Sequence, residues 1–415
     1  EAIVAAAERL GRGDRAAQLA GLGPLQGHLR TEVTEAVATL HYLVLPDRMS
    51  LILTTPYERR SHVWTEWEGE PFSEQRLDAV IAAFHHALSN PAIDPRPLGR
   101  RLYELMLAPF ERELRENGVE LVLLSLDRRL RYVPVAALHD GDRFAVELFE
   151  FSTLTNAGYE LAGRRVAGIP VAALGMTQAA DGFAALPGVG IELDGLVRGD
   201  DGFGLMEGRV LLDAAFDRIA LEDALVIGAG DPAGMGVVHI SSHFHLGRSD
   251  DQSFLLLGTG EWLGLDEIKA DSFAFDFGRV DLLTLSACST GYANPALDGR
   301  ELESLAYITG DRGARSILAS LWPVEDRMTA ILMQRFYELR ERGGYSKARA
   351  MALAQREFIT GEIGSRAHLD GDSIVFETAQ RGAVSLVDPG TPDPHRLGRG
   401  HPFYWAPFVL TGNWR

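Results

Sequence analysis

The sequence predicts an α/β fold whose central sheet is mostly parallel and is covered by helices on both faces. Short apolar runs typical of buried strands alternate along the chain with segments whose apolar residues recur at helical spacing. This alternation favours parallel strands, because two parallel neighbours must be joined by a crossover that a helix usually supplies. With 415 residues, 46% of them hydrophobic, the chain is long enough for two or three folding units and a sizeable core.

Residues 1–30 are rich in Ala, Leu and Arg, and they predict short helices that break at Gly11, Gly13 and Gly21. This helical N-terminal segment would suit the end of a repeat array, although a single unit does not establish a repeat. The chain starts at Glu1, without an initiator Met and without the positively charged start of a signal peptide. We therefore expect a fragment of a longer chain.

Residues 31–165 form the first predicted unit. Two strands, Ala36–Val44 and Ser50–Thr54, predict a hairpin that turns at Pro46-Asp47-Arg48. The elements expected after this hairpin are the helices Ser73–Leu88 and Pro97–Glu116, the strand Leu121–Leu126, and the short segments Arg129–Val133 and Ala145–Leu154. No potential nucleophile in this unit has a convincing base beside it, so we interpret this half as structural.

Residues 166–415 form the second predicted unit, in which the alternation is sharper. Its expected strands are Val166–Leu174, Arg209–Leu212, Gly236–Ser241, Ser253–Leu257, Val280–Leu285, Arg315–Leu321 and Phe408–Leu410. Its expected helices are Gly190–Arg198, Ala214–Ala224, Leu265–Ala270, Glu301–Gly310, Glu325–Arg342 and Ser346–Ile359. Residues 362–400 have little core pattern and are rich in Gly, Asp and Pro, which predicts a surface insertion.

The charge and the cysteine content exclude several kinds of protein. A net charge of −18, from 40 basic and 58 acidic residues, argues against nucleic-acid binding, which needs a basic surface. No apolar stretch approaches the roughly 18 residues of a membrane span, so no membrane partner is expected. The single cysteine, Cys288, excludes a disulfide within the chain and a cysteine-rich zinc site, and it favours a reducing, cytoplasmic setting.

Two strand ends carry the residues with reactive side chains. The apolar run Val237–Ile240 is followed by two serines and His243, and the run Val280–Leu285 is followed by small residues and Cys288. In open α/β sheets, ligand crevices form at the carboxyl ends of strands. If these two strands are adjacent, His243 faces Cys288 across the crevice and can hold its thiol as a thiolate.

These segments resemble the CHAT family, caspase-like domains that are related to separase and are often attached to tetratricopeptide repeats. The resemblance rests on the segments His239–His243, Leu285–Gly291, Gly313–Asp326, Lys347–Glu357 after Phe336-Tyr337, and His401–Gly412, in this order. It is strong over about 236–412 and weaker back to about residue 31. It implies a caspase-like three-layer sandwich with an inactive N-terminal half and an active C-terminal half. It also implies a cytoplasmic, bacterial cysteine endopeptidase without cofactor, controlled by an attached repeat region or a partner, with a limited set of protein substrates.

Carried over residue by residue, the resemblance makes Cys288 the nucleophile and His243 the base. The backbone N–H groups of Cys288 and of the residue after His243 would form the oxyanion hole. The family usually has Gly after the histidine, whereas this chain has Phe244, whose bulk restricts φ. This departure puts the preformed state of the oxyanion hole in doubt.

The segment after Trp322 suggests how a substrate is selected. Asp326 matches the acid that follows the tryptophan in separase-like sequences, and with Glu325 and Trp322 it would line a substrate pocket that prefers a basic residue at the P1 position. Alternatively, both acids complement the helix dipole in a first turn. The tryptophan would then be a core residue.

Four alternatives remain open at this point. His239, on the same strand, would be a structural histidine or the base itself, and a metal cluster of His239, His243 and His245 would need an acidic ligand that the segment lacks. The glycine-rich segment Gly228–Gly234 has the wrong spacing for a dinucleotide loop. The chain would otherwise be a catalytically silent or switched caspase-like module that docks or senses a partner.

Overall fold

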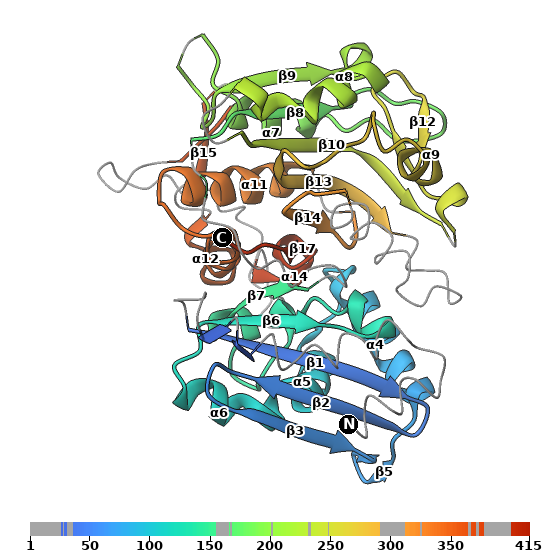
Figure 1. Cartoon of the computed structure of the whole chain (residues 1–415), viewed down its shortest axis with the longest axis vertical. Coiled ribbons are helices and arrows are strands. Elements are labelled where there is room, and N and C mark those ends of the chain that lie inside the picture. The colour runs from blue at the N-terminus through green and yellow to red at the C-terminus, as the bar shows by residue number, and fades with distance from the viewer. Residues whose placement is uncertain are drawn as a thin grey trace.

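The computed structural model describes most of the chain, which Figure 1 shows as a ribbon. It describes residues 26–27, 29–30, 36–154, 166, 168–200, 202–230, 234–247, 249–290, 312–323, 326–363, 367–370, 373–376 and 400–415. For residues 246, 287–290, 326, 367–370 and 373–376 it describes the backbone alone. The predicted helix at 301–310, nearly all of the predicted helical segment 1–30 and most of the predicted insertion at 362–400 lie outside the described residues.

One mixed sheet joins thirteen strands of the described part of the chain. The strands are β1 (Val37–Leu45), β2 (Arg48–Thr54), β3 (Arg59–Trp64), β6 (Leu121–Ser125), β7 (Glu150–Thr153), β8 (Val171–Gly175), β9 (Gly208–Leu212), β10 (Gly236–Leu246), β11 (Phe254–Leu256), β12 (Trp262–Gly264), β13 (Val280–Thr290), β14 (Ser316–Ser320) and β17 (Phe408–Gly412). Figure 1 shows the sheet running the length of the molecule from β9 to β3, with β17 in the middle. The prediction of an α/β fold with a mostly parallel sheet is confirmed.

The sheet consists of two parallel sets of strands that meet in the middle. In one set β9, β8, β10, β13 and β14 are parallel, and in the other β17, β7, β6 and β1 are parallel. The sets meet where β14 pairs antiparallel with β17, from Ser316 opposite Gly412 to Ser320 opposite Phe408. The last strand of the chain therefore lies beside β7, so the sheet is continuous across the predicted boundary at residues 165 and 166. Division of the chain into separate units stays a prediction.

Two core clusters cover the two faces of the parallel set that contains β10 and β13. Alternate residues of a strand point to opposite faces, so Val237 joins the first core cluster, and Val238 and Ile240 join the second. The first cluster includes buried residues of α7 (Gly188–Leu196), α11 (Asp326–Glu341) and α12 (Lys347–Thr360). The second includes those of α8 (Arg218–Ala224) and α9 (Leu265–Ala270).

The remaining elements of the first half follow the predicted order. They are α4 (Glu74–Leu88), α5 (Arg96–Met106) and α6 (Glu111–Glu116), with the small hairpin of β4 (Glu66–Trp67) and β5 (Glu70–Pro71). The predicted segment Arg129–Val133 is a 3₁₀ helix over Arg128–Tyr132, and β10 extends five residues beyond the predicted Ser241. Within the predicted insertion, β15 (Ala367–Asp370) pairs antiparallel with β16 (Ser373–Phe376), and α14 (Pro402–Trp405) follows it. Among the described helices, none has both the length and the apolar character needed to cross a membrane.

Candidate functional site

The strands that carry the histidine and the cysteine are adjacent, as their proposed pairing requires. β10 and β13 pair in parallel, in register from Val237 opposite Leu282 to Ser241 opposite Ser286. An irregularity between Ser241 and Phe244 then shifts the register, and Phe244 lies opposite Cys288. The backbone of Cys288 is thus paired with the residue that follows His243, within the carboxyl-terminal third of both strands.

The imidazole of His243 is held by the loop that follows β8. Its Nε2 atom lies 2.9 Å from the carbonyl oxygen of Ala184, and its ring centroid lies 4.8 Å from that of Phe183. A carbonyl oxygen can only accept a hydrogen bond, so Nε2 carries the proton, and Nδ1 is the basic nitrogen of the neutral ring. A neutral imidazole in this tautomer can take a proton at Nδ1, and the ring is partly exposed to solvent.

A tight turn shapes the loop that holds His243. The backbone N–H of Phe183 donates to the carbonyl oxygen of Ala180 at 2.9 Å, and the two residues between them, Asp181 and Gly182, have φ angles of 51° and 86°. Positive φ at both central positions favours Asp-Gly, because aspartate tolerates the left-handed region and glycine has no Cβ to clash. The sequence alone did not predict a role for this loop, although the Asp-Gly dipeptide is a turn signal.

The base of the same loop is fastened to Asp213. Its carboxylate accepts hydrogen bonds from the N–H and the hydroxyl of Thr177, both at 2.7 Å, and from the N–H of Gln178 at 3.2 Å. Burial alone would raise the pKa of Asp213, but these donors outweigh it and hold that pKa below its usual range. Asp213 itself has a φ of 50°, a conformation that surrounding contacts must hold.

A buried polar network surrounds His239, which lies on β10 four residues before His243. His239 is fully buried, with Nδ1 3.1 Å from the hydroxyl of Tyr337 and Nε2 2.9 Å from a carboxylate oxygen of Glu192. The hydroxyl of Tyr337 also bonds Thr284, 2.7 Å away, and Thr284 lies opposite His239 in the register. Both ring nitrogens of His239 are therefore engaged, which favours its structural role. The network joins α7 and α11 to the two strands.

The side chain of Phe244 is part of the core beside the sheet. Its ring is 3% exposed and lies in the second core cluster with Leu255 and Leu263, and its φ is not in the left-handed region. It pairs with Cys288 on one side and with Leu255 on the other. The core accommodates the bulk of the side chain. The role of its N–H and that of Cys288 in an oxyanion hole stays a prediction.

The predicted substrate-selecting residues are only partly described. Trp322 is 2% exposed, its indole N–H donates to the carbonyl oxygen of Phe403 at 3.1 Å, and its ring meets that of His85 edge-on at 5.3 Å. This surrounding is that of a core residue. Asp326 is the first residue of α11, and its side chain lies outside the described part, as does the whole of Glu325. The selection of a basic residue stays a prediction.

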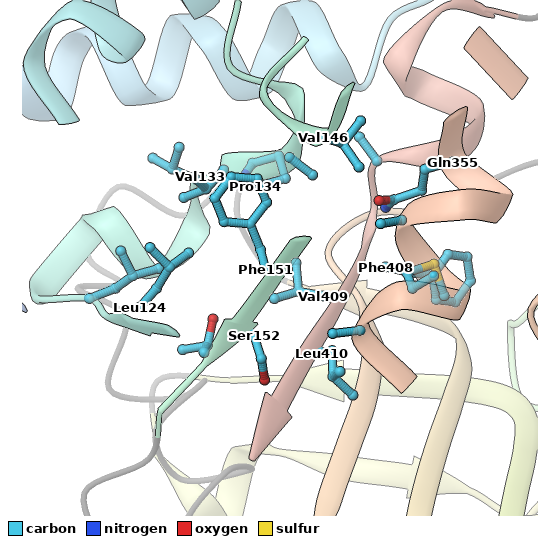
Figure 2. Close-up of a pocket in the computed structure, with 18 residues that line it drawn as sticks. Leu124, Val133, Pro134, Val146, Phe151, Ser152, Gln355, Phe408, Val409 and Leu410 are labelled. Carbon is cyan, nitrogen blue, oxygen red and sulfur yellow. The ribbon is translucent and has the colours of Figure 1, made fainter. Parts of the chain in front are cut away.

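One apolar cavity lies away from these strands. It is formed between β6, β7, β17 and α12, and Figure 2 shows Phe151, Val409 and Leu410 among the side chains that line it. Two of its polar members have partners, since Ser152 donates to the carbonyl oxygen of Gly412 and Gln355 donates to that of Trp405. No lining residue belongs to β10, to β13 or to the loop of Ala184. Among the described residues, no three metal-ligating side chains gather together.

The chain is similar to several solved structures at low identity. It is 9% identical to a chain of the complex of Porphyromonas gingivalis RgpB pro- and mature domains, covering 82% of this chain and 76% of that one with a TM-score of 0.41. It is 10% identical to a chain of the Saccharomyces cerevisiae separase–securin complex, covering 97% of this chain and 31% of that one with a TM-score of 0.48. None of the curated proteins matches it.

The sequence match is to a protein family. The model of the CHAT domain matches residues 96–413, which include β10, β13 and the closing strand β17. This match extends over more than half of the chain and confirms the resemblance seen in the sequence. The chain therefore belongs to the CHAT domain family.

Proposed function

We propose that this CHAT domain is a cysteine endopeptidase in which Cys288 is the nucleophile and His243 is the base. The observation that carries the proposal is the register of β10 and β13, in which the backbone of Cys288 is paired with Phe244, next to His243. The hydrogen bond from Nε2 of His243 to Ala184 supports it, because it leaves Nδ1 as the proton acceptor. The substrate is a protein, and the chemistry needs no metal.

The reaction follows from these two groups. The thiol proton of Cys288 moves to Nδ1 of His243, and the sulfur bonds to the peptide carbonyl carbon, whose oxygen becomes an oxyanion. The N–H groups of Cys288 and Phe244 are the proposed donors to that oxyanion. When the C–N bond breaks, His243 gives the proton to the leaving nitrogen, and a thioester remains. Water then attacks the thioester, the C–S bond breaks, and the carboxyl product leaves as the thiol is restored.

The single cysteine makes the proposal testable without a known substrate. Iodoacetamide alkylates a thiolate, so its rate against pH, followed by mass spectrometry, reports the ionisation of Cys288 alone. In the intact chain we expect alkylation well below pH 8.5, the range of an isolated thiol. His243→Ala should move the profile to about pH 8.5. His86→Ala, on the exposed side of α4, should leave it in place. Identical profiles for the intact chain and His243→Ala would exclude His243 as the base.

Cleavage itself is tested with peptides that carry Arg, Lys, Asp, Leu or Met before the scissile bond. Cleavage that survives Cys288→Ala would exclude this cysteine as the nucleophile. Silence across the panel, together with an ordinary thiol profile, would favour the docking or sensor module instead.

We further propose that Asp326 selects a basic residue before the scissile bond. It begins α11, at the end of the family segment Gly313–Asp326. A carboxylate beside the bound side chain would attract Arg or Lys. In the same peptide panel, Asp326→Asn keeps the shape of the side chain and should abolish the preference. An unchanged preference would contradict the assignment.

A further inference from the structure

Three aromatic side chains form a row that ends at His243. We call Phe183, Phe254 and Trp262 the aromatic row. The rings of Phe254 and Trp262 are stacked, with centroids 4.3 Å apart and planes 7° apart. Phe183 meets Phe254 edge-on at 6.1 Å, and on its other side it lies 4.8 Å from the ring of His243. A continuous aromatic surface therefore leads from the hairpin of β11 and β12 to the proposed base.

The row lies on the face of the hairpin that is turned away from the second core cluster. Phe244, Leu255 and Leu263 lie opposite one another in the register, and all three are buried in that cluster. Phe254 alternates with Leu255 and therefore points to the other face, where its cross-strand neighbour His245 contacts its ring at 5.3 Å. Leu255 and Leu263 are therefore the hairpin residues that pack into the second core cluster. Packing in that cluster does not account for the row.

The row is exposed to solvent at its outer end. Trp262 is 47% exposed, whereas Phe183 and Phe254 are half-buried. Scattered apolar residues are normal on a surface, but a row of three aromatic rings, each next to another, is a patch of the kind that binds ligands. Rigid aromatic side chains give a large contact area at a low entropic cost, which is why they dominate binding hot spots.

We propose that the aromatic row binds an aromatic or branched aliphatic side chain of the polypeptide that is cut at Cys288. This inference rests on the proposed function. The occupant follows from continuity, because a peptide bound at Cys288 must pass His243, and the first ring of the row touches that histidine. An extended residue advances about 3.3 Å, so side chains within roughly five positions of the scissile bond reach the row. The turn at Asp181-Gly182 presents Phe183 to this path.

The test compares two alkylating reagents that share one reacting group. Iodoacetamide and N-benzyl iodoacetamide both react when the thiolate of Cys288 displaces iodide and a C–S bond forms, but only the second carries a phenyl ring. In the intact chain we expect N-benzyl iodoacetamide to react several times faster and to show saturation with concentration. Trp262→Ala and Phe254→Ala should each lower the ratio of the two rates by roughly fivefold. Trp262→Phe keeps a ring and should retain most of the ratio.

A matched variant controls for the loss of an exposed aromatic side chain elsewhere. Phe273 is 96% exposed and precedes the amino end of β13, the end of the strand that is opposite to Cys288. Phe273→Ala should leave the ratio unchanged. A ratio near one in the intact chain, or a ratio that Trp262→Ala does not lower, would overturn the inference. An equal fall in both rates would also overturn it, because the row would then only support the strand of His243.

The outcomes distinguish failure of this inference from failure of the proposed function. They also distinguish a bound substrate from a second copy of the chain on the aromatic row. The proposed function fails if His243→Ala leaves the pH profile of alkylation unchanged, whatever the reagent ratio. The inference fails on the ratio alone. Sedimentation of the intact chain and of Trp262→Ala checks for a second copy on the row. A dimer that Trp262→Ala converts to a monomer would assign the row to self-association and overturn the proposal.

Discussion

His243 donates its Nε2 proton to the carbonyl oxygen of Ala184, 2.9 Å away and 59 residues earlier in the chain. This bond joins the end of β10 to the loop that leaves β8. It sets which nitrogen of the ring is basic, and it couples the orientation of the ring to the shape of the loop. A change in the turn at Asp181-Gly182 should therefore reach the histidine through the next two residues, Phe183 and Ala184, which contact its ring.

Gly182→Ala tests this coupling. Gly182 has a φ of 86°, where an alanine costs about 1–2 kcal/mol. We expect the loop to shift and the rate of Cys288 alkylation at pH 6–7 to fall severalfold, because His243 loses its orientation. Asp181→Asn is the matched control, since asparagine also tolerates the left-handed conformation. Equal rates for Gly182→Ala and the intact chain would show that the loop does not position the ring.

The pairing of the two site strands could be predicted, whereas the loop could not. The runs Val237–Ile240 and Val280–Leu285 are continuous and apolar, which is typical of strands buried on both faces. Ala184 and His243 are 59 residues apart in the sequence, and neither Ala184 nor Phe183 belongs to a periodic pattern. Only the turn dipeptide marks the loop. A turn signal does not say what the turn will touch.

The strand β3 and the form of the segment Arg129–Val133 could not be predicted from the sequence. The strand Arg59–Trp64 is polar and largely exposed at the edge of the sheet, so it lacks the apolar alternation that identifies a strand. The segment Arg129–Val133 begins instead as a 3₁₀ helix at Arg128, whose φ is 51°. Such a backbone is set by its surroundings in the fold, which local sequence does not reveal.

The packing of α7 on α11 depends on a glycine. A Cβ at Gly195 would lie 1.9 Å from Nε2 of Gln334, which is buried and donates to the carbonyl oxygen of Ile191. Gly195→Ala must displace this side chain and break its hydrogen bond, at a cost of about 1–3 kcal/mol. In the same helix, a Cβ at Gly190 meets nothing within 4 Å. Gly190→Ala should stabilise the protein by up to about 1 kcal/mol.

Urea unfolding of the two alanine variants measures this difference. Both variants gain the same preference of alanine for the helix, so the difference between them isolates the clash. We expect Gly195→Ala to be less stable than Gly190→Ala by at least about 1 kcal/mol. Gly195→Ala of equal or higher stability would mean that Gln334 leaves its site without cost.

The hydroxyl of Tyr337 should stabilise the fold through its two buried partners. Burial raises the pKa of this phenol despite the hydrogen bond with Thr284, so it remains protonated and can donate at neutral pH. Tyr337→Phe leaves His239 and Thr284 without this partner, and we expect a loss of about 1–3 kcal/mol in urea unfolding. Tyr57→Phe removes a hydroxyl from a residue that is 77% exposed and should change stability by less than about 0.5 kcal/mol. Equal effects of the two variants would show that the network contributes nothing.

Lys347 should make stability depend on pH in the alkaline range. It is fully buried at the start of α12, where its ammonium lies 3.2 Å from Asp281 and 3.3 Å from the carbonyl oxygen of Asn413. Desolvation by burial, with a smaller repulsion from Arg340, lowers the pKa of Lys347 from 10.5 to about 8, although Asp281 opposes the change. The charged form is thus disfavoured in the folded state.

The sign of the effect follows from proton binding. Below pH 8 the lysine is charged in both states, and its burial costs the folded protein the full penalty. Between pH 8 and about 10.5 the unfolded chain binds more protons, so stability rises with pH, by an amount on the order of 3 kcal/mol.

Lys347→Met keeps a long apolar side chain without a titrating group, and Asp281 keeps the guanidinium of Arg340 at 2.7 Å. Urea unfolding at pH 7, 8, 9 and 10 should show the intact chain gaining stability relative to Lys347→Met. Parallel profiles would mean that the lysine is charged and compensated throughout, because a folded pKa near that of the unfolded chain gives no relative slope.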